Sequence, residues 1–429
     1  MGQDSHVVRP AKNVLGSLRM PGDKSISHRY GMLAAIAEGK SRFKNFSTGA
    51  DCASTLACVE TLGATIRRDG TTVEIEGRGS ELVCPAKPLD CGNSGSTMRM
   101  LSGIVAAQDF DCEMFGDESL SQRPMARVID PLTKMGAGIE AGDKGRPPLK
   151  IHGRKLRAID YATPVPSAQV KSCVLFAGLL AEGTTSVEEP VRTRDHTELA
   201  LRAFGAEVVR DKNRVSILGG QKLKAIEAVV PGDISSAAFF LCAAALFPES
   251  NMMIDGLGLN PTRAVLLDVL FALGARSSML RVEEHHGELV GTVRLQSAPL
   301  RGLKLSGAQT AALIDEVPVL AAIAPFTRDG IEIRDARELR VKESDRIHSI
   351  VRNLQSLGAQ VEEFEDGLRV PGGQKLKGGR IDSFGDHRIA MAFAVAALRA
   401  EGEVDIAGAD AARISFPEFY DMLESVVER

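Results

Sequence analysis

The chain has 429 residues, of which 44% are hydrophobic and 25% charged, and its formal net charge at pH 7 is −4. This length predicts two domains, because a single hydrophobic core seldom grows beyond about 250–300 residues. The near-neutral charge and the 4% content of aromatic residues argue against a nucleic-acid-binding protein, which needs a basic surface and stacking side chains.

The cysteine pattern and the hydropathy of the sequence indicate the cellular compartment of the protein. The segment 1–13 lacks the apolar core of a signal peptide, and apolar runs such as 390–398 are too short to span a bilayer. The seven cysteines form no C-x-x-C pair and all precede residue 243, which is typical of free thiols in a reducing compartment. We predict a cytoplasmic protein.

In chain order, six segments join a polar head to about three turns of almost unbroken apolar residues. They are PGDKSISHR (21–29), CGNSGSTMR (91–99), VPSAQVKS (165–172), GDISSAAF (232–239), LIDEVPVLA (313–321) and GDHRIAM (385–391), each with the apolar residues that follow it. Each pattern predicts a helix that is buried on all sides. The heads recur roughly every 70 residues, a period that indicates an internal repeat.

A second helix closes five of these units in phase with the heads. It ends in a Gly-Ala pair whose glycine is expected in the left-handed conformation that follows a helix. These glycines are Gly63, Gly136, Gly205, Gly274 and Gly358. Residues rich in β-branched side chains, such as those at 184–190 and 330–335, predict a strand between the two helices.

The sixth unit lacks a Gly-Ala pair and a closing strand, and we expect VLGSLRMPGD (14–23) to supply that strand. This arrangement places one domain in residues 1–20 and 230–429 and the other in residues 21–229. Each domain then holds three repeats of an α/β unit, and the two connecting strands can act as a hinge.

The heads also concentrate charge. The N-terminus of a buried helix offers unpaired N–H groups and about half a positive charge, which together bind anions. The cations at the heads and nearby loops are Lys24, Arg29, Arg99, Arg123, Arg194, Lys342, Arg346 and Arg388, and the acids among them include Asp315, Glu343, Asp345 and Asp386. Guanidinium groups bind phosphate and carboxylate in a bidentate manner. A single basic residue at a helix start is commonly solvated surface, but this recurrence beside apolar helices favours a site for small polyanions.

Other motifs are incomplete. The segment EGKS (38–41) lacks the earlier glycine of a P-loop, and GNSG (92–95) is not a nucleophile elbow. The eight histidines show no metal-ligand spacing, and His387 is the one best placed for a functional role.

The six heads, together with QRPM (122–125), RDHTE (194–198), ELRVKESDRI (338–347) and SFPEF (415–419), form an ordered series over the whole chain. This series resembles the 5-enolpyruvylshikimate-3-phosphate synthase family. The resemblance implies a two-domain inside-out α/β barrel-like fold, with three repeats per domain and six in all. It also implies transfer of the enolpyruvyl group of phosphoenolpyruvate to the 5-hydroxyl of shikimate 3-phosphate, with release of phosphate through a tetrahedral intermediate. No metal or organic cofactor is implied, and we expect a monomer without nucleic-acid or membrane partners.

The resemblance also implies the roles of individual residues. The catalytic residues would be Asp315 as base, Glu343 as acid, and Lys24. Shikimate 3-phosphate would be bound by Lys24, Ser25, Arg29, Ser167, Ala168, Gln169, Arg194, Asp315 and Lys342. Phosphoenolpyruvate would be bound by Lys24, Asn93, Gly95, Arg123, Gln169, Lys342, Arg346, His387 and Arg388.

The sequence departs from the family pattern at two positions. Ala168 stands where many members have serine, and Ile414 stands where many have lysine, with Arg413 one residue earlier. Gly95 keeps the small residue next to phosphoenolpyruvate that the family uses, so we expect inhibition by glyphosate.

Two alternatives share the repeat fold. The sister family that acts on UDP-N-acetylglucosamine typically has a Lys-Asn pair and a catalytic cysteine in a mobile loop. Here the pair is Lys24-Ser25, and the corresponding stretch 116–124 has no cysteine. An RNA-processing protein of the same fold would need a basic face, which the net charge of −4 does not favour.

Overall fold

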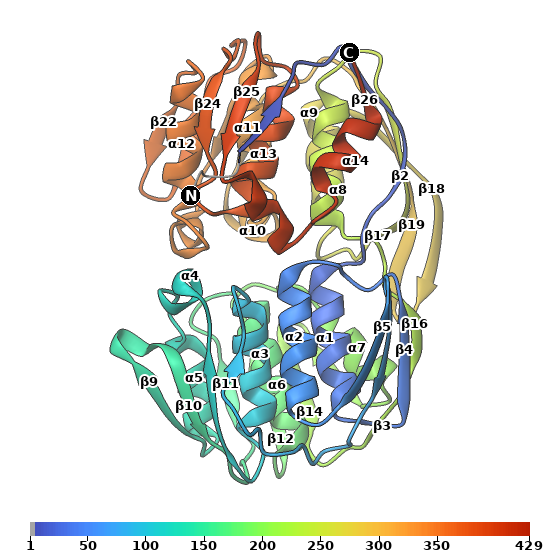
Figure 1. Ribbon diagram of the computed structural model, residues 1–429, viewed down its shortest axis with the longest axis vertical. Helices are drawn as coiled ribbons and strands as arrows, with labels where there is room; N and C mark the ends of the chain where they lie inside the picture. The colour runs from blue at the N-terminus through green and yellow to red at the C-terminus, as the bar shows by residue number, and fades with distance from the viewer. Residues whose placement is uncertain (1–4) are drawn as a thin grey trace. The chain divides into compact units, whose positions relative to one another are not determined.

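The computed structural model describes residues 5–429 and divides the chain into two compact units (Figure 1). Unit 1 comprises Met1–Pro21, Pro231–Glu284 and Leu289–Arg429, and unit 2 comprises Gly22–Val230 and His285–Glu288. The chain passes between the units one residue away from each predicted boundary. The chain also enters unit 2 briefly at His285–Glu288, the turn of a hairpin whose strands lie in unit 1. Nothing in the sequence indicated this crossing.

The sheets within residues 22–230 share one plan. In the orders β16-β4-β6-β5, β7-β8-β10-β9 and β11-β12-β14-β13, the first two strands are parallel and the remaining neighbours are antiparallel. A short parallel pair, β15 with β3, adds to them. The strands are β3 (Ala37–Glu38), β4 (Lys40–Lys44), β5 (Thr65–Asp69), β6 (Thr72–Glu76), β7 (Leu89–Asp90), β8 (Asp111–Phe115), β9 (Gly138–Gly142), β10 (Arg146–His152), β11 (Asp160–Ala162), β12 (Thr184–Glu188), β13 (Val208–Asp211), β14 (Arg214–Leu218), β15 (Leu223–Lys224) and β16 (Glu227–Val229).

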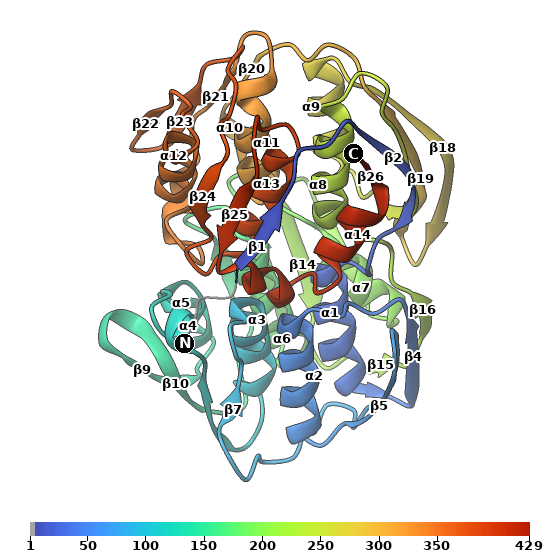
Figure 2. The same cartoon turned by 45° about the horizontal axis from the view of Figure 1, so that its top comes forward.

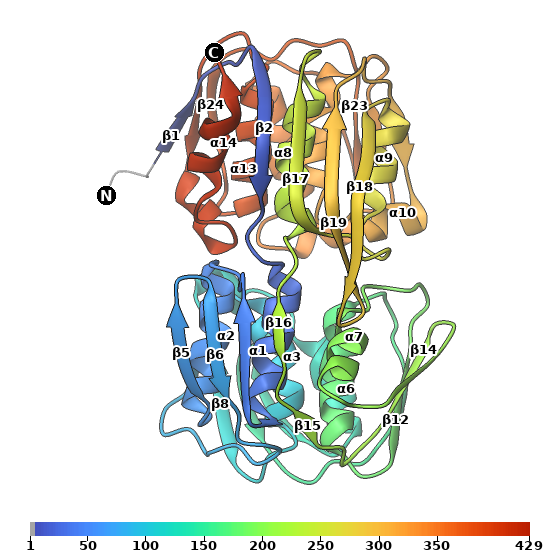
Figure 3. The same cartoon turned by 90° about the vertical axis from the view of Figure 1, so that its right-hand side faces the viewer.

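The helices of unit 2 pack against these sheets (Figures 1 and 3). They are α1 (Lys24–Ala35), α2 (Ala50–Thr61), α3 (Gly95–Val105), α4 (Glu118–Ser121), α5 (Ala126–Lys134), α6 (Ala168–Leu180) and α7 (His196–Ala203), with a 3-10 turn η1 (Asp143–Gly145). Helices α3 and α6 approach closely because Gly103 has no side chain, and a Cβ there would lie 2.1 Å from the backbone oxygen of Cys173.

Unit 1 repeats the plan in one four-stranded, one five-stranded and one three-stranded sheet. Their strand orders are β20-β21-β23-β22, β18-β19-β17-β2-β26 and β1-β25-β24 (Figures 2 and 3). The strands are β1 (Ser5–Val8), β2 (Asn13–Arg19), β17 (Asn251–Gly258), β18 (Arg276–His285), β19 (Glu288–Gln296), β20 (Leu303–Leu305), β21 (Ile331–Ile333), β22 (Glu362–Phe364), β23 (Gly367–Val370), β24 (Gly379–Asp382), β25 (Val404–Ala407) and β26 (Val427–Glu428).

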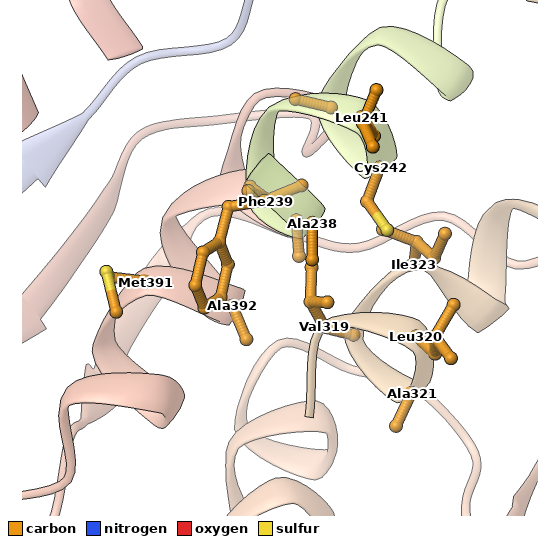
Figure 4. Close-up of a cluster of buried hydrophobic side chains, with 14 of the residues drawn as sticks. Ala238, Phe239, Leu241, Cys242, Val319, Leu320, Ala321, Ile323, Met391 and Ala392 are labelled. Carbon is orange, nitrogen blue, oxygen red and sulfur yellow. The ribbon is translucent and has the colours of Figure 1, made fainter. Parts of the chain in front are cut away.

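The core of unit 1 is built on α8, α11 and α13. Figure 4 shows side chains of α8, among them Phe239 and Cys242, facing Val319 of α11 and Ala392 of α13. The helices of the unit are α8 (Ile234–Ala245), α9 (Val265–Leu273), α10 (Gly307–Ala312), α11 (Val317–Ile323), α12 (Arg346–Ser356), α13 (His387–Ala397) and α14 (Phe419–Val426), with 3-10 turns η2 (Ala324–Phe326), η3 (Arg337–Val341) and η4 (Ala409–Ile414).

The predicted head helices and closing glycines are confirmed. Five of the six head helices begin behind a residue whose side chain accepts a hydrogen bond from the first turn; these caps are Asp23, Ser94, Ser167, Asp233 and Asp386. The five predicted glycines all have positive φ values, between 84° and 109°.

The prediction for the N-terminal strand is wrong in detail. The sheet that accompanies the sixth head helix, α13, is completed by β1, in which Val8 pairs with Val404 and both side chains are fully buried. The predicted segment instead forms β2, which runs parallel to β17 and antiparallel to β26. Strand β2 therefore takes the place that a short parallel strand occupies in the other sheets. In residues 5–429, no helix is long and apolar enough to cross a membrane.

Candidate functional site

In unit 2, Lys24 opens α1 and is held by an acid from the next helix. Its Nζ lies 2.9 Å from Oδ2 of Asp51, and the two side chains are 18% and 8% exposed. The cap Asp23 accepts a hydrogen bond from the backbone N–H of Ile26 at 2.9 Å. This arrangement presents one ammonium group at the start of a buried helix and fixes its direction.

Arg29 lies one turn further into α1 and is 3% exposed. Its Nε donates to Oγ1 of Thr197 at 2.6 Å, and its Nη2 donates to Oγ of Ser172 at 2.8 Å. The remaining nitrogen, Nη1, donates to the backbone oxygen of Ser25 at 2.7 Å. Burial, together with the nearby charge of Arg194, lowers the pKa of Arg29 to about 10, so the group stays cationic at neutral pH.

Two guanidinium groups flank Gly95, the first residue of α3. A Cβ at this position would lie 3.1 Å from Nη1 of Arg99 and 3.4 Å from Nη1 of Arg123. Arg123 is 6% exposed and donates to Oδ1 of Asn93 at 2.7 Å and to its backbone oxygen at 3.1 Å. The missing side chain lets both cations lie close to the backbone at a helix N-terminus, an arrangement suited to an anion.

Gln169 joins the head of α6 to that of α3. Its Oε1 accepts from Nη1 of Arg99 at 2.9 Å, and its Nε2 donates to Oγ of Ser96 at 2.9 Å. Ser167 caps α6 by accepting from the backbone N–H of Val170. The structure thus brings the predicted residues of these two heads together.

A chain of buried hydrogen bonds joins the heads of α1 and α3 through α2. His28 Nδ1 lies 2.7 Å from Oγ1 of Thr55, which lies 2.6 Å from Oγ1 of Thr97. The Thr97 hydroxyl donates in turn to Oγ of Ser94, the cap of α3, at 2.7 Å. Burial, followed by the charges of Lys24 and Arg29, lowers the pKa of His28 well below 6.5, so the imidazole is neutral in the folded protein.

Replacing His28 by Asn is expected to weaken the pH dependence of stability. The unfolded chain takes up a proton on His28 below about pH 6.5 whereas the folded chain does not, so the free energy of unfolding of the wild type falls as the pH decreases below that value. The difference in slope between wild type and His28→Asn should approach about 1.4 kcal/mol per pH unit. Urea titrations between about pH 7.5 and 5.5 measure it, and parallel curves for both proteins would contradict the neutral buried imidazole.

In the described part of unit 1, three guanidinium groups surround Asp315, two residues before α11. Oδ1 lies 3.7 Å from Nη1 of Arg346, and Oδ2 lies 3.8 Å from both Nη1 of Arg263 and Nη2 of Arg388. Arg388 Nη1 also donates to the backbone oxygen of Asp315 at 2.7 Å. These cations favour the ionised carboxylate, the form that a general base needs.

Arg346 binds two further carboxylates and is 1% exposed. Its Nη2 donates to Oε2 of Glu343 at 2.5 Å, and its Nε donates to Oδ2 of Asp386 at 2.7 Å. Burial opposes the charged form, but the surrounding carboxylates, that of Asp386 first, raise the pKa of Arg346. Glu343 is thereby held at the start of α12, with its side chain 18% exposed.

Lys342 and His387 complete this cluster. Burial lowers the pKa of Lys342, and the Asp315 carboxylate acts against that decrease. His387 is 2% exposed, and its Nδ1 lies 4.0 Å from Oδ1 of Asp386. Asp386 also caps α13 by accepting from the N–H of Arg388 at 2.9 Å.

Arg413 lies apart from these contacts. Its Nε is 3.3 Å from Oδ1 of Asp410, and its side chain is 75% exposed. Ile414 is half-buried at the end of η4. The structure therefore shows Arg413 in a local ion pair of its own turn.

Sequence reasoning missed residues that hold the predicted ones in place. Asp51 and Arg263 contact Lys24 and Asp315, and both lie outside the heads that the repeat identified. For Arg263 the available signal was its place directly after an Asn-Pro-Thr turn. Within residues 5–429, no group of three or more His, Cys, Asp or Glu side chains is arranged to hold a metal ion.

The two units thus carry different chemistry. The heads of unit 2 combine cations with amide and hydroxyl groups, which suits the binding of phosphate and carboxylate groups. The heads of unit 1 place carboxylates against arginines, which adds candidates for proton transfer to candidates for anion binding.

Comparison with known proteins agrees with this chemistry. The model of the EPSP synthase (3-phosphoshikimate 1-carboxyvinyltransferase) family matches residues 8–423. The chain is 67% identical to the 3-phosphoshikimate 1-carboxyvinyltransferase of Koribacter versatilis and 56% identical to that of Solibacter usitatus, with 98% of this chain and 99% of each relative covered.

Solved structures show the same similarity. An EPSP synthase structure from Acinetobacter baumannii has a TM-score of 0.88 and 41% sequence identity, covering 99% of this chain and 98% of that chain. The enolpyruvyl transferase NikO from Streptomyces tendae has a TM-score of 0.79 at 18% identity, which is a likeness of fold.

Proposed function

The chain belongs to the EPSP synthase family, and we infer that it transfers the enolpyruvyl group of phosphoenolpyruvate to shikimate 3-phosphate, a transferase step of the shikimate pathway. The observation that carries this inference is the 67% identity to a 3-phosphoshikimate 1-carboxyvinyltransferase over 98% of the chain. The chain has the mixed α/β fold of the enolpyruvyl transferases.

We propose that units 1 and 2 are the two domains of an inside-out α/β barrel-like fold, with three repeats in each. The shared strand order supports this count, because each of the six sheets with three or more strands accompanies one head helix. The hairpin turn at 285–288 then belongs to the domain of unit 2 although its strands belong to unit 1.

Shikimate 3-phosphate would be bound chiefly by the heads of unit 2. The proposed ligands are Lys24, Ser25, Arg29, Ser167, Ala168, Gln169 and Arg194, joined by Asp315 and Lys342 of unit 1. The contacts of Arg29 and Gln169 with neighbouring heads support their part, because they fix polar groups at helix starts. Ala168 offers its backbone N–H but no hydroxyl.

Phosphoenolpyruvate would be bound by cations and small polar groups of both units. The proposed ligands are Lys24, Asn93, Gly95, Arg123, Gln169, Lys342, Arg346, His387 and Arg388. The two guanidinium groups that lie close to Gly95 at the start of α3 support this assignment.

The proposed reaction begins with loss of the 5-hydroxyl proton of shikimate 3-phosphate to Asp315. The oxygen attacks C2 of phosphoenolpyruvate while Glu343 gives a proton to C3, which yields the tetrahedral intermediate. Loss of a C3 proton and of phosphate then restores the double bond. The ion pair with Arg346 favours the ionised form of Glu343. Glu343 therefore has to take up its proton when bound substrate neutralises the charge of Arg346.

Phosphate release from phosphoenolpyruvate, measured in parallel with shikimate 3-phosphate and with UDP-N-acetylglucosamine, tests the function. We expect release with shikimate 3-phosphate and none with the nucleotide sugar. Release with the nucleotide sugar alone would instead favour the sister activity, and silence of folded protein with both acceptors would contradict the proposed reaction.

We further propose a cytoplasmic monomer. The seven free cysteines, of which six are buried, support a reducing compartment. Sedimentation of the purified protein tests the oligomeric state.

Glyphosate is expected to compete with phosphoenolpyruvate, because the glycine at position 95 has no side chain that would crowd Arg99 and Arg123. At saturating shikimate 3-phosphate, the apparent KM for phosphoenolpyruvate should rise with glyphosate concentration while kcat stays constant. Inhibition that excess phosphoenolpyruvate does not relieve would contradict this expectation.

A further inference from the structure

Arg263 is a buried arginine of unit 1 that none of the six heads contains. It is 4% exposed and follows a turn fixed by Asn260, whose Oδ1 accepts from the backbone N–H and the hydroxyl of Thr262 at 2.9 and 2.7 Å. The Arg263 N–H itself donates to the backbone oxygen of Asn260 at 2.8 Å. The guanidinium therefore extends from a rigid support just ahead of α9.

The Arg263 guanidinium joins the start of α8 to the start of α11. Nη2 donates to the hydroxyl of Ser235, and that hydroxyl donates to the carboxylate of Glu316. Nη2 also lies 3.8 Å from Oδ1 of Asp233 and from Oε1 of Glu316. The other terminal nitrogen, Nη1, lies 3.8 Å from Oδ2 of Asp315.

The charges that face Asp315 come from several elements. Arg346 of α12 and Arg388 of α13 have nitrogens within 3.8 Å of the Asp315 carboxylate. Lys342 adds a positive charge at longer range, and Glu316, the next residue in the chain, adds a negative one. Under the proposed function, the first two arginines also bind the anionic groups of phosphoenolpyruvate. Their charge is then shared with the substrate at the moment when Asp315 has to act.

Arg263 is not among the residues that we propose to bind phosphoenolpyruvate, and its partners include three carboxylates and the hydroxyl of Ser235. We propose that Arg263 is a positioning residue for the reaction, which holds the Asp315 carboxylate in place and ionised while substrate occupies the other arginines. This inference rests on the proposed function. Arg263 would act through Asp315, without contact to substrate.

Steady-state kinetics of Arg263→Gln and Arg263→Lys, measured from about pH 5 to 9, test the proposal. Arg263→Gln should lower kcat by about 10²-fold, the smaller end of the contribution of a general base, with both KM values changed less than about threefold. The acidic limb of its kcat profile should move to higher pH by about one unit, because an opposite charge near a carboxylate lowers its pKa by about this much or more. Arg263→Lys should restore the position of that limb.

Arg328→Gln is the matched control, because Arg328 pairs with Asp329 at an exposed position of the same unit. It should leave kcat and the pH profile unchanged. An acidic limb of Arg263→Gln that coincides with the wild type would overturn the proposal, as would a rise in the KM for phosphoenolpyruvate at constant kcat, which indicates direct binding. Should Arg263→Gln fail to fold, Arg263→Lys decides the question. An acidic limb of Arg263→Lys at the wild-type position supports the proposal. If Arg263→Lys binds both substrates but has lost turnover at every pH, the proposal is overturned. Absence of phosphate release by the wild type would instead refute the proposed function, and this inference with it.

Discussion

Replacing Asp315 by Asn is expected to lower kcat by about 10²–10⁴-fold, the usual contribution of a general acid or base. The amide keeps the size of the side chain but accepts no proton at neutral pH. The backbone oxygen of residue 315 remains available to Arg388, so the start of α11 should keep its position. Initial rates of phosphate release at saturating substrates give kcat.

Binding of shikimate 3-phosphate to Asp315→Asn should stay within about threefold of the wild type, because the proposed phosphate ligands lie in unit 2 and single interactions with a neutral hydroxyl contribute modestly. Calorimetric titration of both proteins measures this affinity. Asp329→Asn, at an exposed ion pair, is the control and should turn over like the wild type. Retained turnover of Asp315→Asn would remove Asp315 from the role of base.

The head helices could be predicted because their signal is local and repeated. A capping residue followed by three apolar turns specifies a buried helix whatever surrounds it, and the glycines after the second helices, Gly63 for example, require a conformation that other residues adopt at a cost. The N-terminal strand was misplaced because strand pairing is not local. Whether β1 or β2 pairs with the sheet beside α13 depends on which edge of that sheet is open, and the sequence after the sixth head does not indicate which edge this is.

The cations of the site could be predicted from their positions at the heads, but their partners could not. Arg29 donates to Thr197, which lies 168 residues further along the chain, and Arg263 reaches Asp315 from a loop without a repeat signal. Such contacts follow from how helices from different repeats pack. A residue that supports a functional group is therefore identified only when the packing is known.

The buried cation Lys171 illustrates how strongly such support can depend on charge pairing. Its side chain is fully buried within α6, and its Nζ lies 2.8 Å from Oε2 of Glu189 and 3.0 Å from Oε1 of Glu198. Glu198 is also paired with Arg210. The next residue of α6, Ser172, carries the hydroxyl that accepts from Arg29, so this network stabilises the part of unit 2 that we propose to bind shikimate 3-phosphate.

Replacing Lys171 by Met is expected to lower the free energy of unfolding by about 3–5 kcal/mol, because it leaves buried carboxylate charge without its partner. Urea unfolding of the full chain measures the change. Lys222→Met is the matched control, since Lys222 forms an ion pair of similar length, 2.9 Å, with Glu38 but both side chains are more than half exposed. Exposed pairs of this kind contribute about 0–1 kcal/mol.

The cause of the loss can be separated from the loss of packing. Adding Glu189→Gln and Glu198→Gln to Lys171→Met removes the carboxylate charges that faced Lys171 while keeping the side chains close in size. Arg210, which then loses its pair with Glu198, has a side chain that is 17% exposed. If uncompensated charge is the cause, the triple variant should be more stable than Lys171→Met alone, since neutral or apolar replacements of whole buried networks are often tolerated. If the triple variant is less stable still, the glutamates contribute through their hydrogen bonds, such as that from Thr193 to Glu189, and the charge of Lys171 is not what holds α6 in place.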